Sequence, residues 1–290
     1  MQWQSTSAFT GESGFGPWKN YCTDEIDEYF PVTLENNSLL DFFGASTDIS
    51  GDYAIIGAPL DEISGTASIY KFDASSNTWQ LQSLIMDANG QSNDYFGYDV
   101  AISGEYAVVG VEEDDESTFT NNGSAQVFKR NTSTGNWEFQ QKLINQMPAN
   151  DDKFGHAVSI DGDYIIIGAY LDDESNINNT GSASIYKRNT NTNAWEFQQK
   201  LINSNANPSD NFGYDVSISG DYIIVGAKED DISVNANSGS ASIFKRNTST
   251  NVWEFQQLLT DNNINSSELF GNSVSITDGY ACLLYTSRCV

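Results

Sequence analysis

The sequence contains few basic residues, no long apolar segment and little cysteine. Lysine and arginine number 13 against 40 aspartate and glutamate residues, so the formal net charge is −27 at neutral pH. Such a chain repels the phosphate backbone, and no basic run exceeds two residues, which excludes a nucleic-acid-binding function. Apolar runs stay well below the ~18 residues of a membrane-spanning helix. The three cysteines form neither a disulfide framework nor a CxxC metal motif.

The composition nevertheless describes a chain that folds. Hydrophobic residues make up 39% and aromatic residues 12% of the sequence, which is too much for a disordered acidic segment. At 290 residues the chain can bury a sizeable core in one large domain or two ordinary ones. The first residues show neither the charged nor the apolar region of a signal peptide, so none is predicted in this segment.

One motif recurs along the whole chain. Its clearest copy, FGYDVAISGEYAVVG, starts at Phe96, and further copies start at Phe43, Phe154, Phe212 and Phe270, the last of them incomplete. From Phe96 onward the copies are 58 residues apart, and a tryptophan recurs at the same interval. The first interval is 53 residues, because the loop after the first copy is five residues shorter. A repeat of this length with strand-like contents predicts propeller blades rather than a helical solenoid.

Each repeat contains four predicted strands. YDVAIS alternates apolar and polar residues, and YAVVGV is an apolar run that suits a strand covered on both faces. GSAQVFKR and WEFQQKLI follow as the third and fourth strands, joined by the short turn NTSTGN. No stretch carries a helical period. Such a sheet exposes two apolar faces and must stack on its neighbours, so the sequence predicts an all-β β-propeller of four-stranded antiparallel blades.

The repeats divide the chain into three parts. Residues 39–281 hold four complete units and the start of a fifth. Residues 1–38 form an N-terminal segment, in which EYFPVTL fits the last strand of a preceding blade. The final stretch, CLLYTSRCV, matches no unit, so we predict that residues 282–290 are a non-native tail. Four blades without a closed ring would expose apolar faces and aggregate, whereas a small ring closed by N-terminal strands would be monomeric.

Two short marks in each unit resemble the FG-GAP repeat family of β-propellers. In the first unit they are Phe43-Gly44 and Gly57-Ala58-Pro59, and the two glycines are separated by 13 residues in all four units. The marks and the recurring tryptophans are the predicted structural positions of the repeat. They are Phe43, Gly44, Gly57, Phe96, Gly97, Gly110, Phe154, Gly155, Gly168, Phe212, Gly213, Gly226, Trp79, Trp137, Trp195 and Trp253.

The resemblance implies a secreted or cell-surface module for recognition and adhesion. The integrin α-subunit head is a more distant relative with a seven-bladed ring, of which this chain would be an incomplete fragment. Integrin-type repeats carry a calcium loop, DxDxDG, between the marks, whereas here the place holds tight hairpins such as SISGDY. A two-residue turn cannot supply the several oxygen ligands that calcium needs. We therefore predict no metal and no other cofactor at that position, with calcium capture by other acidic loops as an alternative.

An acidic pair follows the second glycine of each unit by four and five residues. Because the offset is constant, the four loops are expected at the same rim of the propeller. Carboxylates arranged in this way attract cations or a basic ligand, whereas carboxylates in turns also hydrogen-bond the backbone of their own loop. Both interpretations stay open. The ligand-binding candidates are Asp61, Glu62, Asp114, Asp115, Asp172, Asp173, Asp230 and Asp231.

Other repeated polar positions favour structural roles. An acidic residue two positions before each Phe-Gly mark is expected to close a turn; these residues are Asp41, Asp94, Asp152, Asp210 and Glu268. The single histidine, His156, takes the place of Tyr98 and Tyr214 in other units, and no nucleophile pattern accompanies it. The tryptophans could stack on sugars, but their fixed place at the start of a strand favours packing between blades.

These patterns favour a non-enzymatic module that binds a protein or a glycan through its blade-connecting loops. Enzymes break repeat symmetry at the active site, whereas every polar cluster of this sequence is expected to recur, so no catalytic residue is predicted. The alternative is that the chain is the propeller portion of a larger secreted hydrolase or lyase, with its catalytic residues elsewhere.

Overall fold

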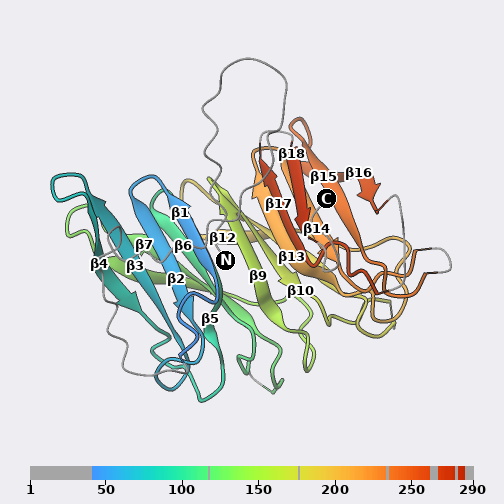
Figure 1. Cartoon of the computed structure of the whole chain (residues 1–290), viewed down its shortest axis with the longest axis horizontal. Helices are drawn as coiled ribbons and strands as arrows, with labels where there is room; N and C mark the ends of the chain where they lie inside the picture. The colour runs from blue at the N-terminus through green and yellow to red at the C-terminus, as the bar shows by residue number, and fades with distance from the viewer. Residues whose placement is uncertain are drawn as a thin grey trace, which may run out of the picture. The chain divides into compact units, whose positions relative to one another are not determined.

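The computed structural model describes residues 41–116, 118–175, 177–232, 235–261, 267–277 and 280–284. These residues form eighteen strands, every pairing between them is antiparallel, and the described part contains no helix (Figure 1). It follows that this part holds no helix long and apolar enough to cross a membrane. The strand expected within residues 1–38 lies outside the described residues. The predicted all-β class is confirmed.

The strands form four sheets of four, and a sheet of two follows them. Within each sheet the strands lie side by side in chain order, as predicted for one blade. Blade one contains β1 (Thr47–Ser50), β2 (Tyr53–Ala58), β3 (Thr66–Asp73) and β4 (Thr78–Ile85). Blade two contains β5 (Phe96–Ser103), β6 (Tyr106–Val111), β7 (Ser124–Arg130) and β8 (Trp137–Leu143). Blade three contains β9 (Phe154–Asp161), β10 (Tyr164–Ala169), β11 (Ser182–Arg188) and β12 (Trp195–Leu201).

Blade four contains β13 (Phe212–Ser219), β14 (Tyr222–Ala227), β15 (Ser240–Asn247) and β16 (Val252–Leu259). The fifth unit is described as β17 (Ser273–Thr277) and β18 (Tyr280–Leu284). Strand β18 pairs with β17 in regular register, so it extends into the first residues of the predicted non-native tail.

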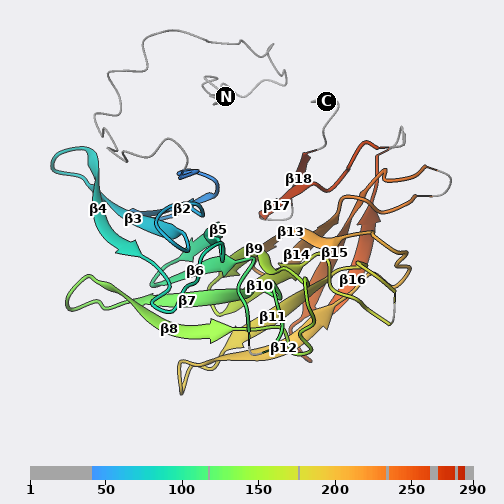
Figure 2. The same cartoon turned by 90° about the horizontal axis from the view of Figure 1, so that it is seen from below.

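Hydrophobic cores lie between consecutive blades, whose sheets face one another in Figures 1 and 2. The second strands, YAVVGV and YIIIGA, are buried along their whole length in blades two and three. Each of these strands lies inside its own sheet and is covered by a neighbouring sheet on both faces, which explains its continuous apolar run. The phenylalanines of the first marks, Phe96, Phe154 and Phe212, are fully buried in these cores.

The two repeated glycines meet where one blade contacts the next. A Cβ atom added to Gly110 would lie 2.0 Å from the carbonyl oxygen of Gly155, and the same holds for Gly168 and Gly213. Gly155 itself has a φ of +92°, a conformation that residues with a side chain rarely adopt. The Gly-Ala-Pro-like mark of one blade therefore packs directly on the Phe-Gly mark of the following blade, and both need glycine.

The first strand of each blade is an edge strand, and after blade one side chains from the preceding blade cap its N–H groups. Asp99 Oδ2 accepts the Val158 N–H at 2.6 Å, and Asp215 Oδ2 accepts the Val274 N–H at 2.6 Å. Ser159 Oγ likewise accepts the Ile218 N–H at 3.2 Å. Unpaired strand edges invite pairing with another chain, so these side chains protect the edge and fix the register of neighbouring blades.

Trp137, Trp195 and Trp253 lie between blades, whereas Trp79 packs on Phe72 within blade one. Trp195 packs edge-on against Tyr106 of blade two, with 5.5 Å between the ring centroids. The Arg188 guanidinium carbon lies 5.0 Å from the centroid of the Tyr106 ring. Gln141 of blade two accepts the Trp195 N–H at 2.8 Å and donates to the Trp195 carbonyl oxygen at 2.8 Å. The same contacts join blade four to blade three through Trp253. The outermost strands of consecutive blades are thus joined by glutamine side chains, not by backbone hydrogen bonds of the kind that pair strands within a sheet.

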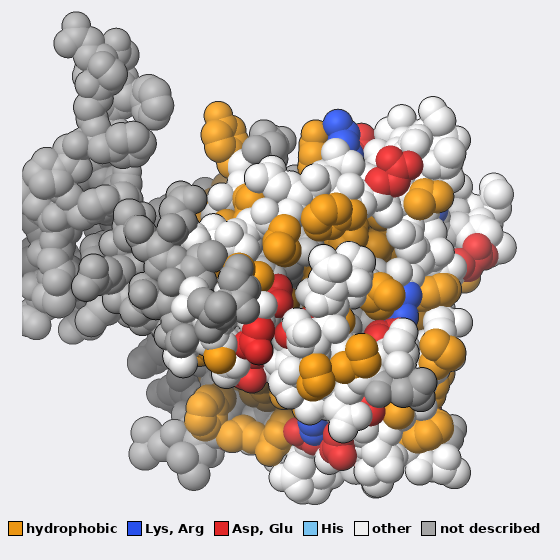
Figure 3. All heavy atoms as spheres, turned by 90° about the vertical axis from the view of Figure 1, so that its right-hand side faces the viewer, with side chains coloured by type: hydrophobic (Ala, Val, Ile, Leu, Met, Phe, Trp, Pro, Cys, Tyr) orange, Lys and Arg blue, Asp and Glu red, His pale blue; other side chains and the backbone are white. Residues whose placement is uncertain are grey.

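The outermost strands also expose hydrophobic side chains. Figure 3 shows the side of the molecule that carries β15 and β16, where hydrophobic side chains lie in separate groups among polar ones. On β16 the exposed hydrophobic residues are Val252, Phe255 and Leu258.

Candidate functional site

The first acid of each candidate pair is tied to the third strand of its own blade. Asp114 Oδ2 accepts the hydroxyl of Ser124 at 2.5 Å, and Asp172 and Asp230 accept Ser182 and Ser240 at the same distance. Asp114, Asp172 and Asp230 are buried. In the shorter loop of blade one, Asp61 accepts Thr66 Oγ1 at 2.8 Å. These four carboxylates connect each loop to the strand that follows it.

The second acid of each pair is exposed but also contacts its loop. Asp115, Asp173 and Asp231 accept the backbone N–H groups of Asn121, Asn179 and Asn237 at 2.7, 2.8 and 2.7 Å. One carboxylate oxygen of each makes this bond, and each side chain is accessible to solvent. Glu62 is the exposed counterpart in blade one. The exposed acids therefore occupy equivalent, fixed positions in consecutive blades.

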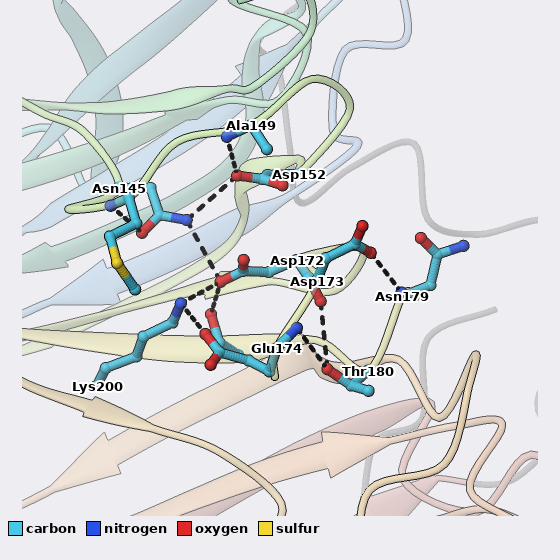
Figure 4. Close-up of polar contacts among 11 residues, drawn as sticks. Asn145, Ala149, Asp152, Asp172, Asp173, Glu174, Asn179, Thr180 and Lys200 are labelled. Carbon is cyan, nitrogen blue, oxygen red and sulfur yellow. Dashed lines mark hydrogen bonds and ion pairs between the residues drawn. The ribbon is translucent and has the colours of Figure 1, made fainter. Parts of the chain in front are cut away.

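Blade three shows how the buried acid is neutralised (Figure 4). Lys200 Nζ lies 2.6 Å from Asp172 Oδ2 and also pairs with Glu174. Asn145 donates to Asp172 Oδ2 at 3.3 Å and to Asp152 Oδ2 at 3.4 Å. Lys142 makes the equivalent ion pairs with Asp114 and Glu116 in blade two. In blade four the corresponding residue is Leu258, and no ion pair of a described lysine reaches Asp230.

Three of the acids before the Phe-Gly marks, Asp94, Asp152 and Asp210, close turns and are buried. Asp94, Asp152 and Asp210 each accept the backbone N–H of the residue three positions earlier, at 2.5, 2.6 and 2.6 Å. Burial raises the pKa of the Asp152 carboxyl to about 7 and that of Asp210 to about 6. Desolvation is the main cause, and the neighbouring loop carboxylates Asp172 and Asp230 add to it.

The loops do not bring together a metal centre in the described part of the chain. No group of three or more histidine, cysteine, aspartate and glutamate side chains there could hold a metal ion. Loop hydroxyls, amides and lysines occupy much of the hydrogen-bonding capacity of the buried carboxylates. The acidic loops expose to solvent one acid at the equivalent position of each blade. These acids are Glu62, Asp115, Asp173 and Asp231.

A second group of polar residues lies beside these loops and does not recur from blade to blade. It comes from the residue after each Phe-Gly mark and from the last residue of each second mark in blades two to four. We call these residues the Tyr/His cluster: Tyr98, Glu112, His156, Tyr170, Tyr214 and Lys228. The repeat predicts that every polar cluster recurs, but this one does not. In blades two to four the first position holds Tyr, His and Tyr, and the second holds Glu, Tyr and Lys.

His156 lies at the centre of the Tyr/His cluster. Its Nδ1 atom is 2.9 Å from Glu112 Oε1, and both side chains are buried. Ring centroids of Tyr98, Tyr170 and Tyr214 lie 5.0, 4.3 and 4.6 Å from the imidazole. These rings come from blades two, three and four, so the histidine joins three blades at one point.

The Tyr/His cluster also holds a cation. Lys228 Nζ lies 3.5 Å from the ring centroid of Tyr214, within the range of a cation–π contact. Burial raises the pKa of the Tyr98 phenol, as it does for Tyr170, and the Glu112 carboxylate adds to both shifts. The phenols therefore stay protonated and remain hydrogen-bond donors. The three tyrosines and Lys228 are half-buried, which leaves part of each side chain open to solvent.

The sequence does contain the signal for this cluster. One position follows the Phe-Gly mark and the other ends the second mark. In blades two to four the first holds Tyr, His and Tyr, and the second holds Glu, Tyr and Lys, although the glycines of the marks do not change. Their meeting could not be predicted, because Glu112 and His156 are 44 residues apart and belong to different blades. By contrast, the tryptophans considered for sugar stacking are buried in blades two to four.

Comparison with known proteins agrees with this fold. The sequence matches the family model of the FG-GAP repeat at residues 35–70, 79–128, 137–186 and 195–244. A structure of a candidate 6-phosphogluconolactonase from Bacteroides uniformis is similar, with a TM-score of 0.52 and 12% identity over 76% of this chain and 57% of that one. A functionally unknown protein from Desulfotomaculum acetoxidans has a TM-score of 0.48 and 15% identity over 79% of this chain and 60% of that one.

The chain thus spans less than two thirds of either protein of known structure. At 12% identity the likeness to the Bacteroides protein concerns the fold alone. No curated protein sequence matches the chain.

Proposed function

Since the chain belongs to the FG-GAP repeat family, we propose that it is a non-enzymatic recognition module that binds a protein ligand through its acidic loops. The ligand presents a cationic surface. We place the module at the cell surface or outside the cell, in a role such as adhesion.

One observation carries this proposal: the exposed acids Asp115, Asp173 and Asp231 hold the same fixed position in three consecutive blades. Their hydrogen bonds to loop backbone keep the carboxylates in place before a partner arrives, which lowers the entropy lost on binding. The net charge of −27 adds long-range attraction for a basic surface and speeds its association.

The proposal can be tested with an oligolysine peptide as the probe and calorimetry at low and physiological salt. The triple variant Asp115→Asn, Asp173→Asn, Asp231→Asn keeps the hydrogen-bond acceptors of the loops and removes three charges. We expect it to weaken peptide binding about tenfold, since several charge–charge contacts are lost together.

The matched control removes three exposed charges from the outermost strands, as Glu138→Gln, Glu196→Gln and Glu254→Gln. This control is expected to change binding less than about twofold, as a remote surface charge does in salt. If both triple variants lose the same affinity, or if neither does, the acidic loops are not the binding surface.

A further inference from the structure

We infer that the Tyr/His cluster is the centre of the protein-binding surface, and that it accommodates an arginine side chain of the cationic partner. This inference rests on the proposed function and names the chemistry of its ligand. The six residues that form the cluster include positions at which the repeated blades differ.

The position of the cluster fits the centre of an interface. Glu112 precedes the acidic pair of blade two by two residues, and Lys228 precedes that of blade four by the same number. The cluster is therefore continuous with the acidic loops. Protein interfaces commonly consist of a few aromatic anchors surrounded by charged residues that exclude water and steer the partner. Half-buried tyrosines beside a row of exposed carboxylates have this composition.

The cluster is held rigid before any partner binds. The hydrogen bond between His156 and Glu112 fixes the imidazole, and the three tyrosine rings pack around it from three blades. The Tyr170 and Tyr214 rings also meet edge-on at 5.3 Å. Anchors that keep their rotamers lose little entropy on binding, which favours affinity.

Cations cover tyrosine rings at the junctions between blades, where Lys71, Lys129 and Lys187 lie 5.7, 5.4 and 5.3 Å from the ring centroids of Tyr53, Tyr106 and Tyr164. At three junctions between blades an arginine guanidinium covers a tyrosine ring. The pairs are Arg130 with Tyr53, Arg188 with Tyr106 and Arg246 with Tyr164, at 5.0, 5.0 and 4.7 Å. A planar guanidinium stacks on an aromatic face and donates hydrogen bonds at the same time, which an ammonium does less well.

The exposed loop carboxylates Asp115 and Asp231, each three residues after a cluster residue, favour a cation, whereas the carboxylates nearest the cluster already have partners. Besides Glu112, the carboxylates Glu113 and Glu229 are adjacent in sequence to cluster residues. Glu113 pairs with Lys153 at 2.5 Å, and Glu229 lies 3.9 Å from Lys228 Nζ. Lys228 Nζ lies 3.5 Å from the ring centroid of Tyr214 and 5.9 Å from that of Tyr170, at the outer limit of a cation–π contact. Tyr214 is therefore occupied, and we assign the arginine to Tyr98 and Tyr170.

The experiment compares an oligoarginine with an oligolysine peptide of equal length on the whole chain. Both peptides carry the same charge, so the ratio of their dissociation constants isolates the contribution of the guanidinium. We expect oligoarginine to bind about fivefold more tightly, as cation–π contacts at half-exposed sites allow. The double variant Tyr98→Leu, Tyr170→Leu keeps apolar volume and removes the rings, and is expected to bring the ratio close to one.

Two controls accompany the leucine variant. Tyr98→Phe with Tyr170→Phe retains the rings and is expected to retain most of the arginine preference. Tyr280→Leu removes an exposed tyrosine far from the acidic loops in sequence and is expected to leave the ratio unchanged. The phenylalanine variant also shows whether a loss in the leucine variant comes from the ring or from disturbed folding.

The possible results separate this inference from the proposed function. If the acidic-loop variants weaken both peptides but the leucine variant keeps the arginine preference, the inference is wrong and the proposed function stands. If a neutral glycan binds and competes with the peptides at the cluster, the cationic protein ligand is wrong as well.

Discussion

The contact between the two repeated glycines can be tested where blade three meets blade four. A Cβ atom on Gly168 would lie 2.0 Å from the carbonyl oxygen of Gly213 and 3.1 Å from its carbonyl carbon. Ordinary contacts of a Cβ atom begin at 3.4 Å, so Gly168→Ala requires β10 and β13 to move apart by roughly 1.4 Å. Both partners are backbone atoms within sheets, which cannot rotate away. We expect the free energy of unfolding to fall by about 3 kcal/mol, at the upper end of overpacking effects.

The matched control is Gly162→Ala in the hairpin turn of the same blade. Gly162 has a φ of +56°, and a Cβ atom there would meet no other atom within 4 Å. Its expected cost is about 1 kcal/mol, the strain of a left-handed alanine alone. Urea unfolding followed by the fluorescence of the buried tryptophans measures both. A loss for Gly168→Ala no larger than that of the control would refute the idea that these glycines set the distance between blades.

Three further predictions concern buried charges. Burial raises the folded-state pKa values of Asp152 to about 7 and of Asp210 to about 6, so these groups stabilise the fold most below pH ~4, and that contribution is lost as the pH rises to ~7. Unfolding titrations should show higher stability at pH 5.5 than at pH 8, and Asp152→Asn should flatten this slope; an unchanged slope would contradict the assignment. Lys200→Met leaves Asp172 without its cation and should cost about 2 kcal/mol by urea unfolding. Leu258→Lys supplies blade four with the lysine of blades two and three and should stabilise it by about 0.5 kcal/mol, whereas destabilisation would contradict the proposed equivalence.

Much of the fold could be predicted because the motif recurs at a constant interval, which shows which stretches of the chain are equivalent strands. The alternation around Val100 and Ile102 marks the first strand, and the apolar run from Tyr106 marks the second. The sequence does not predict the register shift between the third and fourth strands, seen at Ile185 and Tyr186. A bulge of this kind depends on how two strands pair, and nothing in the glutamine-rich fourth strand specifies it.

The candidate site was less predictable, because a constant offset along the chain does not show what a side chain contacts. The members of an acidic pair are neighbours in sequence, yet Asp172 is buried against Ser182 and Lys200, whereas Asp173 is exposed. Which of the two is buried depends on how the loop crosses the end of the sheet. Whether the exposed members bind a ligand stays a prediction.

The difference between repeating and non-repeating positions also predicts how substitutions combine. Asp115, Asp173 and Asp231 lie in separate loops and accept hydrogen bonds from different residues, so charge changes there should add in their effect on binding. Tyr98, Tyr170 and Tyr214 all contact His156, so changes among them should couple through that ring. A repeat in which each blade contributes independently can strengthen binding only by addition. A cluster in which three blades share one histidine makes the blades interdependent, and specificity for one partner geometry follows from that dependence.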